Sequence, residues 1–98
     1  MTVTRISIAA SRVANQVADV IAPALAASDC KPLPIVAMLP SGRVDIVDGY
    51  HRIAGLIAGG AETIDCLVCD DEDLVAAAGN AEDTTAQQAA LEVIYAAA

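Results

Sequence analysis

The chain has 98 residues, which is enough for one domain with a modest hydrophobic core. Its net charge of −8, with only five Lys and Arg residues, argues against a face that tracks nucleic-acid phosphates, because such a face needs many cations. No apolar stretch is long enough to span a membrane and no signal peptide is visible, so we expect a cytoplasmic protein. Its three cysteines, Cys30, Cys66 and Cys69, fit reduced thiols in that compartment.

The first third of the chain predicts a strand followed by a helix. Apolar residues alternate over 2–9, which is typical of a strand. Ser11 is a suitable N-cap for a helix that begins at Arg12, where apolar residues then recur at steps of three and four. We expect Pro23 to kink or split that helix, and 28–32 to be a connector.

A β-hairpin is expected next. Residues 34–39 form a short apolar run, which predicts a buried strand. Residues 40–43 read Pro-Ser-Gly-Arg, a tight turn in which proline presets the backbone angle and glycine can take a positive φ. The second strand then covers 43–47.

The stretch 44–60 organises the rest of the chain, since it predicts a strand that turns sharply into a helix. Asp48 is a suitable N-cap, because its carboxylate can accept hydrogen bonds from the first helical turn. Gly49 provides the bend. Gly59 and Gly60 end the helix, because glycine takes the left-handed C-cap conformation without steric cost.

The first turn of this helix is a candidate anion site. Its backbone N–H groups are unpaired and the helix dipole is positive there. Arg52 can offer a bidentate fork to a phosphate, and His51 can donate to a phosphate oxygen or move a proton near neutral pH. Gly49 lets a ligand approach the backbone. The plainer alternative is that Asp48 only caps the helix, Arg52 pairs with a neighbouring acid, and His51 is a surface residue.

The residues Gly49-Tyr50-His51-Arg52, with Asp48 before them and a Gly-Gly stop after them, resemble the ParB/sulfiredoxin fold family. The likeness is to its stand-alone phage and plasmid members, which carry an Asp-Gly-x-His-Arg motif. The resemblance extends over about 6–74 and is specific over 34–68.

The chain length predicts a single domain over 1–98, and the resemblance implies an α+β (mixed α/β) fold for its core at 6–74, with the last helix beyond the resemblance. The expected fold is a mixed sheet of about four strands flanked by helices, with a C-terminal helix at about 84–97. In the family, this turn holds nucleotide phosphates. By resemblance, that role falls on Gly49, His51 and Arg52, with Tyr50 in the same ligand-binding turn.

Two departures from the family narrow the expected function. Tyr50 stands where sulfiredoxins carry their catalytic cysteine, so sulfinic acid reduction is not expected. No second ParB motif and no helix-turn-helix region follow, so DNA clamping is not expected either. What the resemblance leaves is a nucleotide or phosphate pocket.

Residues 63–69 predict a further strand, in which Cys66 and Cys69 face opposite sides, and this argues against a zinc site. The acids of 70–73 precede a short helix, where they either lie in the solvated first turn or hold Mg²⁺ beside a nucleotide. Thr84-x-x-Gln87 is a capping-box pattern that opens the last helix. This helix docks on the domain's own sheet or pairs with a second copy, through a stripe of Ala86, Ala89, Ala90, Val93, Ile94 and Ala97.

Two functions from different classes follow. The first is a domain that binds a nucleotide, with or without Mg²⁺, at 48–52; phosphoryl transfer or hydrolysis is then the reaction class. In such a reaction Arg52 neutralises phosphate charge, His51 moves a proton, and Asp48 or an acid near Asp71 helps to hold the metal. The second is a non-catalytic, acidic protein-interaction module of a phage or plasmid that retains the fold, with a protein partner or as a homodimer. A DNA-directed role is disfavoured by the charge.

Overall fold

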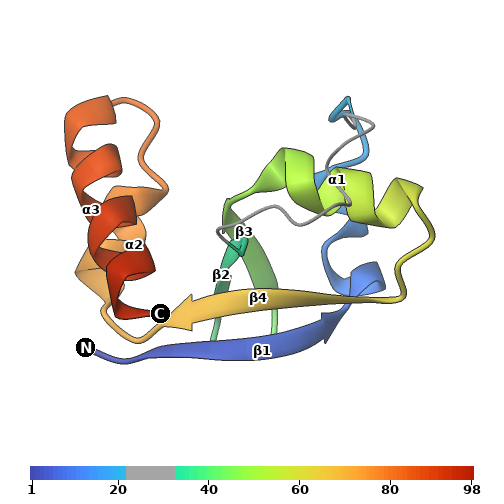
Figure 1. Ribbon diagram of the computed structural model, residues 1–98, viewed down its shortest axis with the longest axis horizontal. Coiled ribbons are helices and arrows are strands. Elements are labelled where there is room, and N and C mark those ends of the chain that lie inside the picture. The colour runs from blue at the N-terminus through green and yellow to red at the C-terminus, as the bar shows by residue number, and fades with distance from the viewer. Residues whose placement is uncertain (22–32) are drawn as a thin grey trace.

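The computed structural model describes residues 1–21 and 33–98 and shows an α+β fold built on one mixed four-stranded sheet (Figure 1). The strands lie in the order β1-β4-β2-β3, so β1 and β3 are the edges. β4 is antiparallel to β1 and parallel to β2, whereas β2 and β3 form the expected antiparallel hairpin. The strands are β1 (Val3–Ala9), β2 (Ile35–Met38), β3 (Val44–Asp48) and β4 (Thr63–Cys69).

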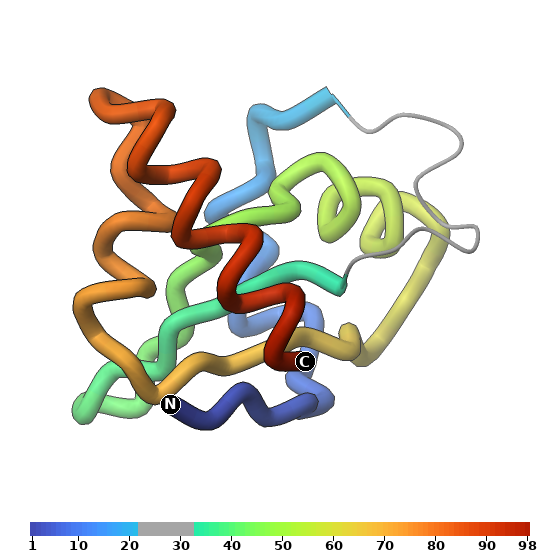
Figure 2. The backbone as a smooth tube through the Cα atoms, turned by 60° about the vertical axis from the view of Figure 1, so that its left-hand side comes forward, coloured from blue at the N-terminus to red at the C-terminus, as the bar shows by residue number. Residues whose placement is uncertain are grey.

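Helical elements cover both faces of this sheet. The helices are α1 (Tyr50–Ala58), α2 (Glu72–Ala78) and α3 (Thr84–Ala97), and two 3-10 turns, η1 (Ala10–Arg12) and η2 (Ala14–Gln16), follow β1. α1 lies over one face, and the α2–α3 pair lies against the other (Figures 1 and 2). The fold class and the final helix are therefore as the sequence predicts. In the described ranges, no helix has both the length and the apolarity needed to cross a bilayer.

β4 carries buried side chains on both faces, so the sheet has a core on each side. Ile64 and Cys66 belong to the core under α1, together with the fully buried Ile53. Leu67 and Cys69 belong to the core under α2 and α3. Cys66 and Cys69 are thus buried free thiols on opposite faces, as the strand periodicity predicts. Cys30 lies outside the described residues.

The α-helix that the sequence predicts from Arg12 is absent over the described residues 12–21, so this prediction is wrong. In its place the backbone forms successive 3-10 turns, with the Val13 N–H bonded to the Ala10 carbonyl at 3.2 Å and the Gln16 N–H to the Val13 carbonyl at 3.0 Å. Three valines at positions 13, 17 and 20 lower the helix propensity of this segment, because β-branched side chains lose rotamer freedom in a helix. The predicted kink at Pro23 and the connector at 28–32 lie outside the described residues.

The side chain of Gln16 gives a second reason for this conformation. Its Nε2 donates to the Val44 carbonyl at 2.7 Å, and its Oε1 accepts from the Ile46 N–H at 2.8 Å. One amide side chain therefore supplies to edge strand β3 the donor and the acceptor that a neighbouring strand would supply. The local chain is held where this pairing is possible, next to β3.

The hairpin turn follows its residue types. The Leu39 N–H donates to the Arg43 carbonyl at 2.8 Å, and the Gly42 N–H donates to the Leu39 carbonyl at 2.8 Å. Gly42 has φ +89°, the left-handed conformation that glycine adopts readily. The turn predicted at 40–43 is confirmed.

The N-cap of α3 lies one residue before the predicted Thr84, and the predicted capping box with Gln87 is wrong, because Ala86 then occupies the position that would have to reciprocate. Asp83 is the N-cap of α3, and its carboxylate accepts from the Ala86 N–H at 3.0 Å. The predicted packing face of α3 is correct at Ala90 and Ile94, which are buried. It is wrong at Ala89, Val93 and Ala97, which are exposed. The face that packs includes Leu91 and Tyr95, and it docks on the chain's own sheet.

We expect Ile94→Ala to lower the free energy of unfolding by about 2–5 kcal/mol, because Ile94 is fully buried and the loss of its side chain leaves a cavity. The matched control is Val93→Ala on the same turn, where the side chain is 45 % exposed and the expected change is within about 0.5 kcal/mol. Urea denaturation of both variants measures the difference. Equal losses would contradict the docking of α3 on the sheet.

Candidate functional site

The elbow between β3 and α1 has the predicted order of strand, bend and helix. β3 ends at Asp48, Gly49 takes φ +95°, and α1 begins at Tyr50. Gly49, not Asp48, is the N-cap, and no side chain of the described residues caps the first turn. The predicted capping role of Asp48 is therefore wrong, because its carboxylate is directed to α3.

Gly49 is required here for two reasons. Its positive φ is disfavoured for residues with a side chain. In addition, a Cβ at this position would lie 2.9 Å from the Cβ of Pro34, the residue that precedes β2. The chain therefore closes on itself at the elbow, and Pro34 rather than a ligand occupies the space beside the glycine.

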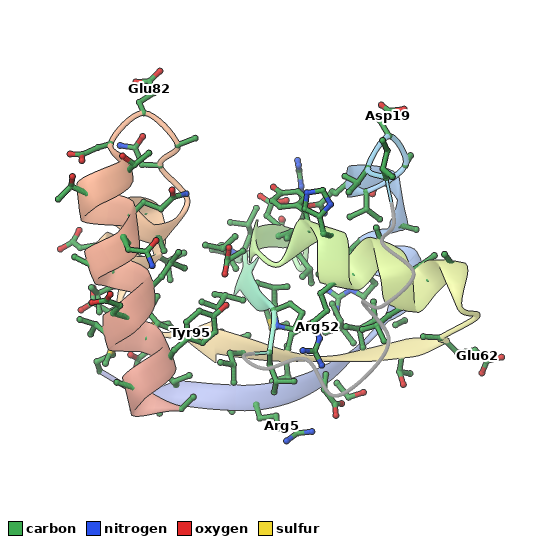
Figure 3. The ribbon with its side chains drawn as sticks, turned by 45° about the horizontal axis from the view of Figure 1, so that its top comes forward. Arg5, Asp19, Arg52, Glu62, Glu82 and Tyr95 are labelled. Carbon is green, nitrogen blue, oxygen red and sulfur yellow. The ribbon has the colours of Figure 1, made fainter. Side chains whose placement is uncertain are left out.

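Asp48 accepts a 2.6 Å hydrogen bond from the hydroxyl of Tyr95, which reaches from α3 toward the elbow (Figure 3). Burial, followed by this hydrogen bond and the nearby carboxylate charge, raises the pKa of Tyr95 well above its ordinary value. The neutral tyrosine therefore serves as a fixed donor. The sequence analysis did not single out Tyr95, although a polar aromatic one position after the buried Ile94 is a side chain that seeks a partner when buried.

Tyr50 and His51 also contact groups of the chain itself. The Tyr50 hydroxyl donates to the Ile46 carbonyl at 2.9 Å. The Nδ1 of His51 lies 3.2 Å from the Ile21 carbonyl, and since a carbonyl only accepts, this contact requires the proton on Nδ1. The His51 side chain is exposed on the outer side of α1.

Arg52 leaves α1 in a different direction from His51, as expected for successive residues about 100° apart around a helix. It is half-buried and lies between α1 and β4 (Figure 3). There it lines a hollow of about 290 Å³. The structure thus brings Arg52 to a hollow but does not bring His51 or Asp48 to the same place. The lining residues are Arg5, Leu33, Arg52, Leu56, Thr63, Ile64 and Asp65.

Within residues 1–21 and 33–98, no strand pairs with β4 along the hollow, because the parallel pairing with β2 begins only at Ile35. The Leu67 N–H donates to the Pro34 carbonyl at 2.8 Å, which places the backbone groups of odd-numbered β4 residues on the β2 side. Pro34 has no N–H to continue the ladder toward Asp65. The backbone of Thr63 and Asp65 therefore presents its donors and acceptors toward the hollow.

At the other side of the hollow, Arg5 projects from β1 on the face of the sheet away from α1 (Figure 3). It pairs with Asp65 at 2.7 Å, and both side chains are largely in solvent. An exposed pair of this kind contributes little to stability. The Arg5 guanidinium is therefore held near the hollow but is not committed to the fold.

The charge of Arg52 acts on two groups near it, the buried thiol of Cys66 and the half-buried hydroxyl of Tyr95. Burial, followed by the charge of Asp65, raises the pKa of the Cys66 thiol to about 11, and Arg52 opposes that rise. Arg52 likewise opposes the raised pKa of Tyr95. Cys66 stays protonated near neutral pH, so it is a core thiol and not a nucleophile.

The acids that follow β4 hold local structure. Asp70 accepts from the Thr2 N–H at 2.6 Å, and Asp71 is the N-cap of α2, accepting from the Asp73 and Leu74 N–H groups at 3.1 and 3.2 Å. Across the part of the chain that is described, no three His, Cys, Asp or Glu side chains gather as a metal site would require. The two alternative Mg²⁺ ligands, Asp48 and an acid near Asp71, stay a prediction; in the structure Asp48 accepts from Tyr95, and Asp71 accepts from the first turn of α2.

Comparisons of the chain with protein-family models, curated proteins and solved structures found no match.

We expect Gly49→Ala to be more destabilising than Gly42→Ala. Both glycines have a positive φ, so each variant incurs about 1–2 kcal/mol of backbone strain. Only at Gly49 does the new Cβ also meet Pro34, whereas at Gly42 no atom lies within 4 Å. Thermal unfolding of the two variants isolates that contact. If Gly42→Ala lost as much stability as Gly49→Ala, the close approach at the elbow would be refuted.

We expect Tyr95→Phe to lower the free energy of unfolding by about 1–3 kcal/mol at neutral pH, because the Asp48 carboxylate loses its hydrogen-bond donor. The pKa of Tyr95 is higher in the folded than in the unfolded chain. The protonated hydroxyl therefore contributes its full stabilisation of the folded state below the ordinary pKa of about 10, and this stabilisation is lost as the pH rises above that value. The gap between wild type and variant should therefore narrow above about pH 10.

Denaturant unfolding between neutral and alkaline pH measures this gap. Tyr50→Phe is the control, since its hydroxyl contacts only a neutral carbonyl and its loss should be smaller. A gap between wild type and Tyr95→Phe that stayed constant with pH would show that the hydroxyl is not held in this way.

Proposed function

We propose that this domain binds a small phosphate-bearing molecule in the hollow between α1 and β4, with Arg52 as the anchoring cation. The observation that supports this proposal is the position of Arg52. The motif resembling the ParB/sulfiredoxin family contains Arg52, and the same side chain lines the hollow of about 290 Å³. A guanidinium can hold a phosphate through two parallel N–H···O bonds, which adds direction to charge.

The size of the hollow limits the ligand. Pockets for small molecules usually measure about 300–1,000 Å³, so a hollow of about 290 Å³ lies just below that range. A mononucleotide or a smaller phosphate ester fits that volume better than a dinucleotide does. Leu33 and Leu56 offer an apolar wall to the uncharged part of the ligand, and the backbone edge at Thr63 and Asp65 offers donors and acceptors to its polar groups.

The proposal is one of binding and assigns no reaction. Catalysis by His51 and Asp48 would require both groups near the phosphate, but His51 faces the Ile21 carbonyl and Asp48 holds the Tyr95 hydroxyl. Phosphoryl transfer and hydrolysis therefore have less support than they had from the sequence motif alone.

A second function, the protein-interaction module that retains the fold, is favoured by a different observation. Asp48, Tyr50 and His51 each contact a group of the chain itself, so this part of the motif has a structural use that needs no ligand. The two functions differ in what they require of Arg52. The ligand-binding function requires the charge of Arg52 in the hollow, whereas the interaction module does not require it to contact a ligand.

Dye-based thermal unfolding with AMP, ADP, ATP and inorganic phosphate tests the proposal, since a ligand that binds the native state raises the melting temperature. We expect a rise for wild type and a loss of about tenfold or more in affinity for Arg52→Ala, because a charge-assisted hydrogen bond is removed. Arg52→Lys keeps the charge without the fork and should bind with intermediate affinity.

The matched control is Arg43→Ala, which removes the same charge from an exposed pair with Asp45 on β3. Because Arg43 is not among the residues that line the hollow, its loss should leave the rise in melting temperature unchanged. No rise for wild type with any of the four compounds, or an equal rise for Arg52→Ala, would reject the pocket and leave the interaction module as the better hypothesis.

A further inference from the structure

Within the described ranges 1–21 and 33–98, backbone hydrogen-bonding groups on the outer edge of β1 have no partner. The Asp70 N–H donates to the Thr2 carbonyl and the Ala10 N–H to the Glu62 carbonyl, so the backbone groups of even-numbered β1 residues point toward β4. Odd-numbered residues must then direct both their N–H and their C=O groups outward. These residues are Val3, Arg5, Ser7 and Ala9.

No element of the described chain covers this edge. β1 is the outermost strand of the sheet, and it forms the lower border of the molecule in Figures 1 and 2. Over residues 1–21 and 33–98, the four outward-facing residues have no backbone–backbone hydrogen bond on that side. β1 is seven residues long, has no proline and carries a single charge at Arg5. It therefore lacks the usual features that prevent an edge from pairing.

The other edge of the sheet is closed. Gln16 fills the hydrogen-bonding positions of Val44 and Ile46 on β3, and the Tyr50 hydroxyl also donates to the Ile46 carbonyl. A strand cannot add there without displacing these side chains. With one edge open and the other closed, pairing through β1 gives a finite assembly and not a filament.

We propose that β1 is an interface for a second copy of this chain, which pairs antiparallel to it and extends the sheet across a two-fold axis. An antiparallel pair is self-complementary, because each outward-facing residue of one strand meets an outward-facing residue of the other. The register with Arg5 opposite Ser7 of the second copy is favoured, since it also sets Val3 opposite Ala9 and uses every outward-facing residue.

Side chains support the same register. It places Ile6 of one copy opposite Ile6 of the other in a non-hydrogen-bonded pair, where side chains are closest. Ile6 is only half-buried in the single chain, so this contact would bury more apolar surface. The neighbouring register, with Val3 opposite Ser7 of the second copy, would instead set the two Arg5 side chains opposite each other. This is unfavourable, because like charges repel.

Ser7→Pro tests the interface directly. Ser7 is exposed and its N–H points outward, so proline removes one donor of the interface while sparing the ladder with β4. Ser7→Ala is the matched control, because it changes the side chain and keeps the N–H. Sedimentation velocity across a dilution series should show a monomer of 9.9 kDa in equilibrium with a dimer for wild type and Ser7→Ala, and only monomer for Ser7→Pro.

Amide hydrogen exchange on the wild type gives a second measurement that does not depend on the variant folding. On concentration, the N–H groups of Val3, Arg5, Ser7 and Ala9 should become protected, while the exposed outer side of α3 stays unchanged. A wild-type chain that is monomeric at every concentration, a Ser7→Pro variant that dimerises as well as Ser7→Ala, or protection that appears on α3 instead would each overturn the proposal. None of these results depends on ligand binding at Arg52.

Discussion

The close approach of Pro34 to Gly49 is the constraint on which the rest of the structure depends. At this point the start of the β2–β3 hairpin touches the bend that leads out of it, and a side chain on Gly49 would not fit. The same proline accepts a hydrogen bond from Leu67 through its carbonyl and has no N–H to offer. One residue therefore positions the elbow, joins β2 to β4, and ends the parallel pairing between them.

That early end of the pairing explains why a hollow exists beside the central strand. A longer β2 would satisfy the backbone of Thr63 and Asp65 and fill the space with side chains. With β2 starting at Ile35, the described residues that border this space include Leu33 and two side chains of α1, Arg52 and Leu56. The bend at Gly49 fixes where α1 starts. Because Arg52 lies three positions after Gly49, the bend also fixes that the Arg52 side chain points from α1 toward β4.

Elements whose signals are local were predictable from the sequence, whereas contacts between distant segments were not. The strand at 63–69, the turn at Gly42 and the bend at Gly49 follow from alternation and from glycine, which act over a few residues. The helix expected from Arg12 failed because Gln16 pairs with β3, a partner 28 residues away at Val44. The role of Asp48 failed for the same reason, since its partner Tyr95 is 47 residues further along the chain. The order of strand, bend and helix at 44–60 was predictable, but which side chains of the motif face the hollow was not, because that direction depends on how distant segments pack around the bend.

An anion site in a chain of net charge −8 needs a physical justification. At physiological ionic strength the Debye length is about 8 Å, so exposed carboxylates at a distance from the hollow are largely screened. A half-buried guanidinium is screened less than they are and would act on the proposed ligand at contact distance, as it acts on the buried thiol of Cys66 and the half-buried hydroxyl of Tyr95. Two acids of the described residues also have partners of their own, since Asp48 accepts from Tyr95 and Asp65 pairs with Arg5. The overall acidity therefore opposes an extended polyanion such as nucleic acid much more than it opposes a single phosphate held at Arg52.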